Sequence, residues 1–269
     1  MKKLIVGSLI FLLFVAALFL LMRMEKYQPI GADVAIYYGR GAWNDSVVAL
    51  EEVVRWMNCT FELVTAEYIN DHGLAVFRVL CIPGGDMYAY GQDLSVNGKD
   101  NIRTFVHDGG GYIGICGGAY FAAERVFWRG NELPMTTPAL FPGIAEGPID
   151  EIMPYPNYTM CTVNIVNHTH PITQSEPDNE TILYYWGPAL VPNAAANVTV
   201  LGTYAKRNLP AMVASEYHQG KVFLVGAHPE IEEDSDRDGV SFGDELQDEG
   251  SEWPIMQTAF LWCMQTQNA

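Results

Sequence analysis

The strongest constraint in the sequence is the alternation of apolar, strand-like runs with helix-like segments over the first half of the chain. Strand-like runs occupy residues 33–38, 61–64, 76–82 and 111–115. Apolar side chains recur at helical spacing in residues 45–57 and 101–107. Because strands that return to one sheet through a helix lie parallel, we predict an α/β fold with a mostly parallel central sheet. Ligands of such sheets bind at the carboxyl ends of the strands.

The second half of the chain differs from the first in composition and in the pattern of its apolar residues. Residues 134–200 are rich in proline, asparagine and threonine and contain short β-type runs, so we predict an irregular or β-rich insertion there. Two apolar runs joined by Gln219-Gly220 predict a hairpin that ends near Gly226. Residues 253–264 predict a final helix with an apolar face.

A cysteine lies between a predicted strand and a predicted helix, in the run Gly114-Ile-Cys116-Gly-Gly118. We predict that residues 117–127 form that helix. A sharp strand-to-helix turn leaves little room for side chains beside the nucleophile, which explains the glycines. The helix points its positive end at the sulfur and favours the reactive thiolate. The pattern indicates a nucleophile elbow with Cys116 as the nucleophile.

A thiolate nucleophile needs a base and a group that orients the base. His228 and Glu230, in the run Val225-Gly-Ala-His-Pro-Glu230 after a late strand, supply both residue types. Gly85, at the end of another strand, and Gly117 offer backbone amides for an oxyanion hole. We also predict that Tyr185 and Trp186 line a substrate pocket.

These segments carry a family resemblance. The runs Gly114–Phe121 and Gly226–Glu230 are similar to the class I glutamine amidotransferase superfamily. Within it, Ile36–Ala42, Leu80–Asp86 and Tyr185–Pro188 resemble the biotin-protein ligase N-terminal-like domain family. The resemblance implies a flavodoxin-like three-layer fold over residues 27–269 with a Cys-His-Glu triad, here Cys116, His228 and Glu230. Because these 269 residues hold no ligase catalytic domain, we expect no biotin transfer from this chain by itself.

Residues 1–26 form a separate segment. Leu4–Met22 is a run of nineteen residues without a charge, flanked by Lys2-Lys3 and by Arg23, and it lacks a small-residue cleavage pattern. We predict an uncleaved transmembrane helix that anchors the protein in a membrane. The alternative is a signal segment that is removed.

Six Asn-x-Ser/Thr sequons favour an extracytoplasmic location of the body, because glycans are added outside the cytoplasm. They lie at Asn44, Asn58, Asn157, Asn167, Asn179 and Asn197. The five cysteines, an odd number, allow at most two disulfides, and we expect Cys116 to be the free thiol. Buried reduced thiols at Cys81 and Cys263 are an equal alternative.

A second motif indicates calcium. Asp234, Asp236, Asp238, Val240 and Glu245 have the spacing of a twelve-residue calcium loop, with Gly239 at the turn. The alternative is a solvated acidic loop, because no helix of sufficient length precedes it. The proposed chemistry requires no cofactor, so a calcium ion is the single candidate.

The net charge of the chain limits the classes of molecule that it is expected to bind. The chain has 15 Lys and Arg against 32 Asp and Glu, a net charge of -17, which disfavours nucleic acid. Residues 230–252 contain eleven acids and one base, so we expect a raised pKa of His228 and a neutral or cationic substrate. We therefore expect a membrane-anchored, extracytoplasmic cysteine hydrolase or amidase that acts on a small-molecule or peptide amide. The alternative is a non-catalytic binding or envelope module on the same fold.

Overall fold

The computed structural model describes residues 31–233, 235–246 and 250–265. The chain separates into two units, residues 1–31 and 32–269, and the following concerns the second. No helix within the described ranges is long and apolar enough to cross a bilayer. The predicted anchor at Leu4–Met22 lies outside the described residues.

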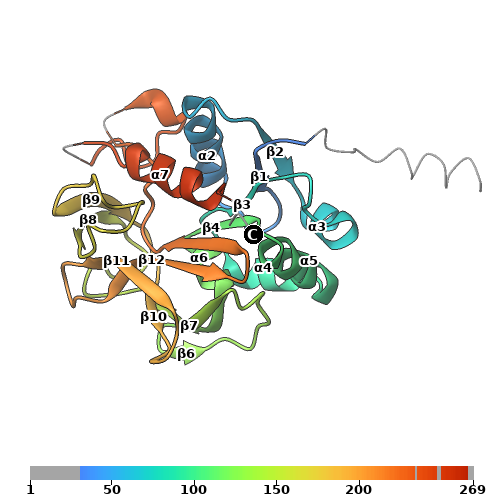
Figure 1. The fold of residues 1–269 in the computed structure, drawn as a ribbon. Coiled ribbons are helices and arrows are strands. Elements are labelled where there is room, and N and C mark those ends of the chain that lie inside the picture. The colour runs from blue at the N-terminus through green and yellow to red at the C-terminus, as the bar shows by residue number, and fades with distance from the viewer. Residues whose placement is uncertain (1–30, 234, 247–249, 266–269) are drawn as a thin grey trace, which may run out of the picture. The chain divides into compact units, whose positions relative to one another are not determined.

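A nine-stranded sheet forms the centre of the fold (Figure 1). In spatial order, its strands are β2 (Phe61–Val64), β1 (Val34–Tyr37), β3 (Val79–Ile82), β4 (Gly111–Ile115), β13 (Gly220–Val225), β12 (Pro210–Tyr217), β11 (Val198–Tyr204), β8 (Thr159–Ile165) and β9 (Asn179–Tyr184). The first five strands are parallel, and every pairing from β13 to β9 is antiparallel. The prediction of a mostly parallel sheet is therefore wrong for this second half, because hairpin connections there replace crossover helices.

Helices cover both faces of the parallel half. β1 is buried on both sides, and its alternate side chains enter two different cores. Val34 and Ile36 pack in one core with α2 (Asn44–Trp56) and α7 (Trp253–Cys263). Ala35 and Tyr37 pack in the other with α3 (Ala66–His72), α4 (Met87–Asp93) and α5 (Val96–His107). The α/β prediction is confirmed, and the three layers follow from continuous apolar strands.

A second, four-stranded sheet contains β10 (Ala189–Pro192), β7 (Phe141–Gly147), β5 (Ala123–Trp128) and β6 (Asn131–Glu132). The predicted helix 117–127 is therefore wrong in its second half. α6 (Gly117–Ala122) ends after six residues, and β5 begins at Ala123. The run Arg125–Trp128 pairs with β7, and its β-branched and aromatic side chains suit a pleated sheet better than a helix. Residues 134–200 contribute strands to both sheets.

The parallel strands β1, β3, β4 and β13 all end at one edge of the central sheet. The segments that follow them hold Trp43, Gly84-Gly85, Cys116 and His228. Four segments that are far apart in the sequence therefore meet at the position where α/β folds bind ligands.

Candidate active site

Cys116 lies at the sharp turn between β4 and α6. Its φ of 45° and ψ of −101° are rare for any residue with a side chain, so the backbone is strained at this position. The amide of Cys116 donates to the carbonyl of Val225 on β13 at 2.9 Å, and its carbonyl accepts from the amide of Tyr120 at 2.9 Å. These two hydrogen bonds hold the thiol in a fixed position, as the turn of a nucleophile elbow does.

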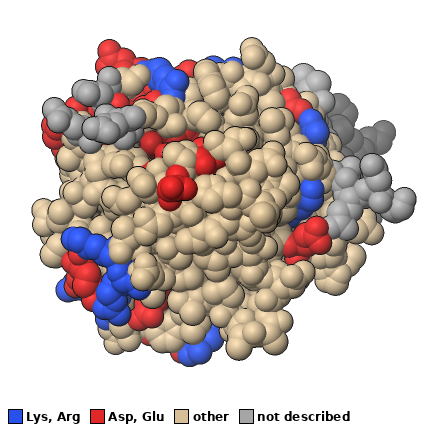
Figure 2. All heavy atoms as spheres, turned by 60° about the vertical axis from the view of Figure 1, so that its left-hand side comes forward, with Lys and Arg blue, Asp and Glu red and all other residues tan. Residues whose placement is uncertain are grey.

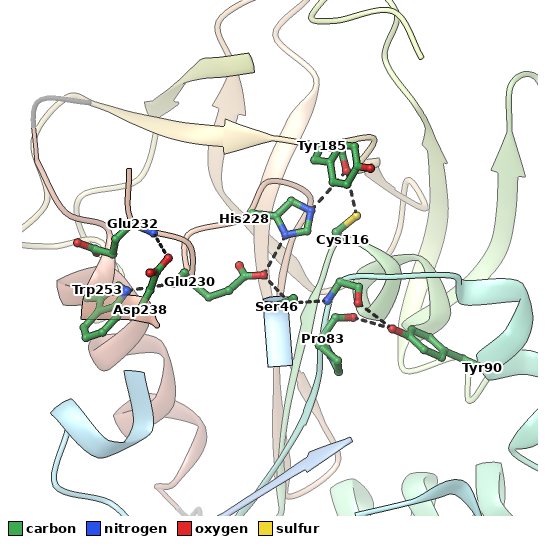
Figure 3. A network of polar contacts seen from close by, with 11 residues as sticks. Ser46, Pro83, Tyr90, Cys116, Tyr185, His228, Glu230, Glu232, Asp238 and Trp253 are labelled. Carbon is green, nitrogen blue, oxygen red and sulfur yellow. Dashed lines mark hydrogen bonds and ion pairs between the residues drawn. The ribbon is translucent and has the colours of Figure 1, made fainter. Parts of the chain in front are cut away.

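His228 lies beside this thiol, and Glu230 lies on the other side of the imidazole (Figure 3). Nδ1 of the fully buried imidazole donates to Oε1 of Glu230 at 2.9 Å. Nε2 of His228 and Sγ of Cys116 each lie 3.4 Å from the carbonyl oxygen of Tyr185. One nitrogen of the imidazole thus contacts the carboxylate, and the other faces the same carbonyl as the thiol does.

The surroundings of His228 favour its charged form. Burial alone would lower the pKa of His228, but the charge of Glu230 and the sulfur of Cys116 raise it to about 10. The imidazole is therefore a cation at neutral pH, and both of its nitrogens are donors. The direction of this pKa shift agrees with the prediction, and Glu230 is the member of the acidic segment that raises the pKa, together with Cys116.

Sequence reasoning missed Ser46. This buried serine on α2 donates to Oε1 of Glu230 at 2.5 Å and accepts from the amide of Gly84 at 2.9 Å. It therefore connects the carboxylate to the loop after β3. One signal in the sequence could have indicated it. Ser46 lies four residues before Leu50 and seven before Val53, so this polar residue is on the buried, apolar face of the helix.

Two backbone amides are available near the thiol. A Cβ on Gly117 would lie 2.3 Å from the carbonyl oxygen of Gly85, so these backbones are in close contact. Gly85 has a φ of 142°, which favours glycine, and it lines the cavity next to Cys116. Within the described part of the chain, neither the amide of Gly85 nor that of Gly117 has a hydrogen-bond acceptor. Such amides can stabilise an oxyanion.

Gly84 provides a direct test of the position of His228. A Cβ on Gly84 would lie 2.5 Å from Cε1 of His228, so alanine there displaces the imidazole. We expect Gly84→Ala to lower the alkylation rate of Cys116 at pH 7 by about 10- to 100-fold, since small misplacements of catalytic groups have large effects. Gly250→Ala is the matched control, because its Cβ would meet no atom of the described residues within 4 Å. An unchanged rate in a folded Gly84→Ala protein would show that the position of His228 does not govern the thiol.

A cavity of about 720 Å³ opens onto this site. Cys116, His228 and Gly85 form part of its wall. The remaining wall is largely aromatic: Trp43, Tyr88, Tyr120, Trp128, Tyr155, Tyr185 and Trp186. The structure therefore places Tyr185 and Trp186 in the wall of this cavity. The other aromatic residues come from separate parts of the chain, with Tyr88 on α4, Tyr120 on α6 and Trp128 on β5, and no sequence pattern links them.

The five cysteines are all free thiols. Burial raises the pKa of Cys81, Cys161 and Cys263, which lie in the core, and also that of the half-buried Cys59. Cys116 is 6% exposed and is the cysteine in the wall of the cavity.

The acidic segment after the site makes contacts of its own. The carboxylate of Asp238 accepts from the amides of Glu232 and Val240, and Glu245 accepts from the hydroxyl of Tyr158. Arg237 pairs with Glu232 at 2.6 Å and lies over the ring of Trp253. On one face of the molecule, Figure 2 shows acidic side chains clustered beside a wide uncharged area.

Calcium stays a prediction. Asp236 begins a short 3-10 helix, and Asp234 lies outside the described residues. Among the residues that are described, no group of three or more His, Cys, Asp or Glu side chains is arranged to hold a metal ion. Five of the six sequon asparagines are exposed and Asn167 is partly buried, so glycosylation also stays a prediction.

Comparisons with known proteins are consistent with this architecture. A family described as "Biotin-protein ligase, N terminal" matches residues 32–252. A biotin-protein ligase of Schizosaccharomyces pombe is 26% identical over 217 residues, which are 74% of this chain and 33% of that protein. An uncharacterized protein of Chlamydia muridarum is 39% identical over 75 residues, which are 26% of this chain and 29% of that one. The chain thus spans about a third of the length of the curated relatives it matches.

Solved structures share the fold. A ThuA-like protein of Bacteroides uniformis has a TM-score of 0.55 at 16% identity and covers 89% of this chain and 94% of its own. A glutamine amidotransferase of Thermotoga maritima has a TM-score of 0.50 at 13% identity and covers 74% and 76%. These similarities support a glutamine amidotransferase-like fold. Because the family match extends over most of the sequence, the chain belongs to the biotin-protein ligase N-terminal family.

Proposed function

We propose that this chain is a cysteine hydrolase of amides or related acyl compounds, with Cys116 as nucleophile, His228 as acid and base, and Glu230 as orienting carboxylate. One observation carries the proposal. The buried His228 contacts Glu230 through Nδ1, and its Nε2 faces the same carbonyl as the strained Cys116 thiol at the wall of a cavity. Nucleophile, base and orienting group are arranged in this order in thiol hydrolases.

The reaction follows from this arrangement. The thiolate of Cys116 attacks the substrate carbonyl carbon, a C–S bond forms, and the amides of Gly85 and Gly117 stabilise the oxyanion. His228 donates its Nε2 proton to the leaving amine as the C–N bond breaks, which leaves an acyl thioester. The neutral imidazole then takes a proton from water, the hydroxide attacks the thioester carbon, and the C–S bond breaks. The acid is released, and the thiolate and imidazolium form again.

The environment of the enzyme is part of the same proposal. The predicted span at Leu4–Met22 would hold the protein in a membrane, with the hydrolase unit outside the cytoplasm. The sequons at Asn44, Asn58, Asn157, Asn179 and Asn197, all exposed, support this side of the membrane. Removal of N-linked glycans from the protein of its native source is expected to increase its gel mobility, and an unchanged mobility would oppose this location.

The function is tested by trapping the intermediate. The full chain in detergent is incubated with a panel of thioesters, activated esters and anilides, and the intact mass is measured. We expect an acyl adduct on Cys116 that hydroxylamine removes, together with release of the leaving group. Absence of any adduct, with ligand binding that Cys116→Ala leaves unchanged, would instead indicate a binding module.

A further inference from the structure

One part of the cavity wall is a series of aromatic rings in contact with one another. Trp128 packs against Tyr155 with ring centroids 6.0 Å apart, and Tyr155 packs against Trp186 at 4.5 Å. Trp186 contacts Tyr185 at 4.2 Å, and Tyr185 contacts Trp43 at 5.3 Å. These rings come from four separate segments of the chain. The folded chain therefore brings these rings together around one cavity, and they make its surface aromatic.

The backbone supports the position of this wall. Trp186 has a φ of 65°, which is unfavourable for a residue with a large side chain. Its indole N–H donates to the carbonyl of Asn157 at 3.0 Å, and its own carbonyl accepts from the hydroxyl of Tyr120 at 3.0 Å. A strained conformation held by two hydrogen bonds at an active site indicates a placement that serves the ligand.

The charges of the side chains that line the cavity disfavour substrates that carry a free carboxylate. No Lys or Arg belongs to the described residues that line the cavity, and the carboxylate among them is Asp86. Oδ1 of Asp86 accepts from the amides of Tyr88 and Ala89. A free amino acid such as glutamine would bring a carboxylate that needs a cationic partner when it is enclosed. Apart from the imidazole of His228 and the amides of Gly85 and Gly117, which the proposed reaction occupies, the cavity surrounds such a carboxylate with aromatic side chains and the negative charge of Asp86.

We infer that the acyl group accepted at Cys116 carries a flat aromatic side group and no free carboxylate. This inference rests on the hydrolase function proposed above and specifies its substrate class. An aromatic group gains both from burial against the rings and from edge-to-face or offset contacts with them. The free-glutamine activity of other glutamine amidotransferase-like proteins is thereby not expected here.

The inference can be tested without the natural substrate. Three chloroacetamides share one warhead and differ only in the nitrogen substituent: unsubstituted, N-benzyl and N-carboxymethyl. The thiolate of Cys116 displaces chloride in each, so a C–S bond forms as the C–Cl bond breaks. We expect the N-benzyl compound to alkylate Cys116 about tenfold faster than the unsubstituted one, and the N-carboxymethyl compound more slowly than both.

A variant of the aromatic wall tests whether these rings cause the preference for the N-benzyl compound. In Trp128→Ala, the ratio of the N-benzyl rate to the unsubstituted rate is expected to fall about three- to tenfold. Trp56→Ala, which removes an exposed indole outside the cavity, is the matched control and keeps the preference. Equal rates for all three compounds at a rapidly reacting Cys116, or the fastest rate for the N-carboxymethyl compound, would overturn the inference and leave the hydrolase proposal intact. A Cys116 that reacts with none of them would overturn both.

Discussion

Replacement of Cys116 by alanine is expected to abolish covalent capture of the ester and thioester probes and to lower their hydrolysis to the uncatalysed rate. The reason is chemical, because alanine offers no atom that can form the acyl bond. Serine at this position keeps the volume but has a far less acidic hydroxyl, so we expect a loss of at least about a thousandfold. Release of the leaving group and the intact mass of the protein measure both effects.

Cys59 is the matched control for this prediction. It is the more exposed thiol, yet it lies outside the cavity, and burial raises its pKa. Cys59→Ala should therefore retain full capture and hydrolysis. If Cys59→Ala lost activity and Cys116→Ala retained it, the site would be assigned to the wrong cysteine.

Glu230→Gln separates the charge of the orienting group from its geometry. Oε1 of Glu230 receives both the His228 and the Ser46 hydrogen bonds, and an amide oxygen can accept the same two bonds. The negative charge that helps to raise the pKa of His228 is lost. We expect the alkylation rate of Cys116 at pH 7 to fall by about 10- to 100-fold, with most of the loss recovered above pH 9.

Glu216→Gln removes an equivalent charge from the exposed surface and should leave the rate unchanged. Far-UV and near-UV circular dichroism show whether each variant is folded. Recovery at high pH is the readout that a merely structural role of Glu230 would not produce. A loss of rate that is equal at every pH would mean that Glu230 only supports the fold.

The parallel half of the fold could be predicted from the sequence because local patterns determine it. The apolar runs at β1, β3 and β4 and the helical spacing of α2 are short-range signals. The glycines around Cys116 indicated the sharp turn. Because ligands of parallel sheets bind at the carboxyl ends of the strands, His228 was expected at the same end of the sheet as Cys116. The resemblance to a known family pointed to the same residues.

The remaining features depend on contacts that a linear pattern does not record. β5 continues directly from α6, and only its pairing with β7 decides that Arg125–Trp128 is a strand. Ser46 contacts Glu230 across 184 residues of sequence. The aromatic wall is assembled from helix, strand and loop segments whose spacing in the sequence has no period. Long-range packing, not local propensity, therefore determines which side chains line this cavity.

The central claim is that His228 controls the reactivity of Cys116. The most direct test is the pH dependence of alkylation at Cys116 in the full chain and in His228→Gln, with peptide mapping to separate Cys116 from the other thiols. Because His228 has a pKa raised to about 10, its positive charge is present throughout the range from pH 6.5 to 8.5. We predict that the rate in the unaltered protein changes less than about threefold over this range, whereas the variant loses about tenfold per pH unit below pH 8.5, as an ordinary thiol does. Parallel pH profiles in the two proteins would contradict the account.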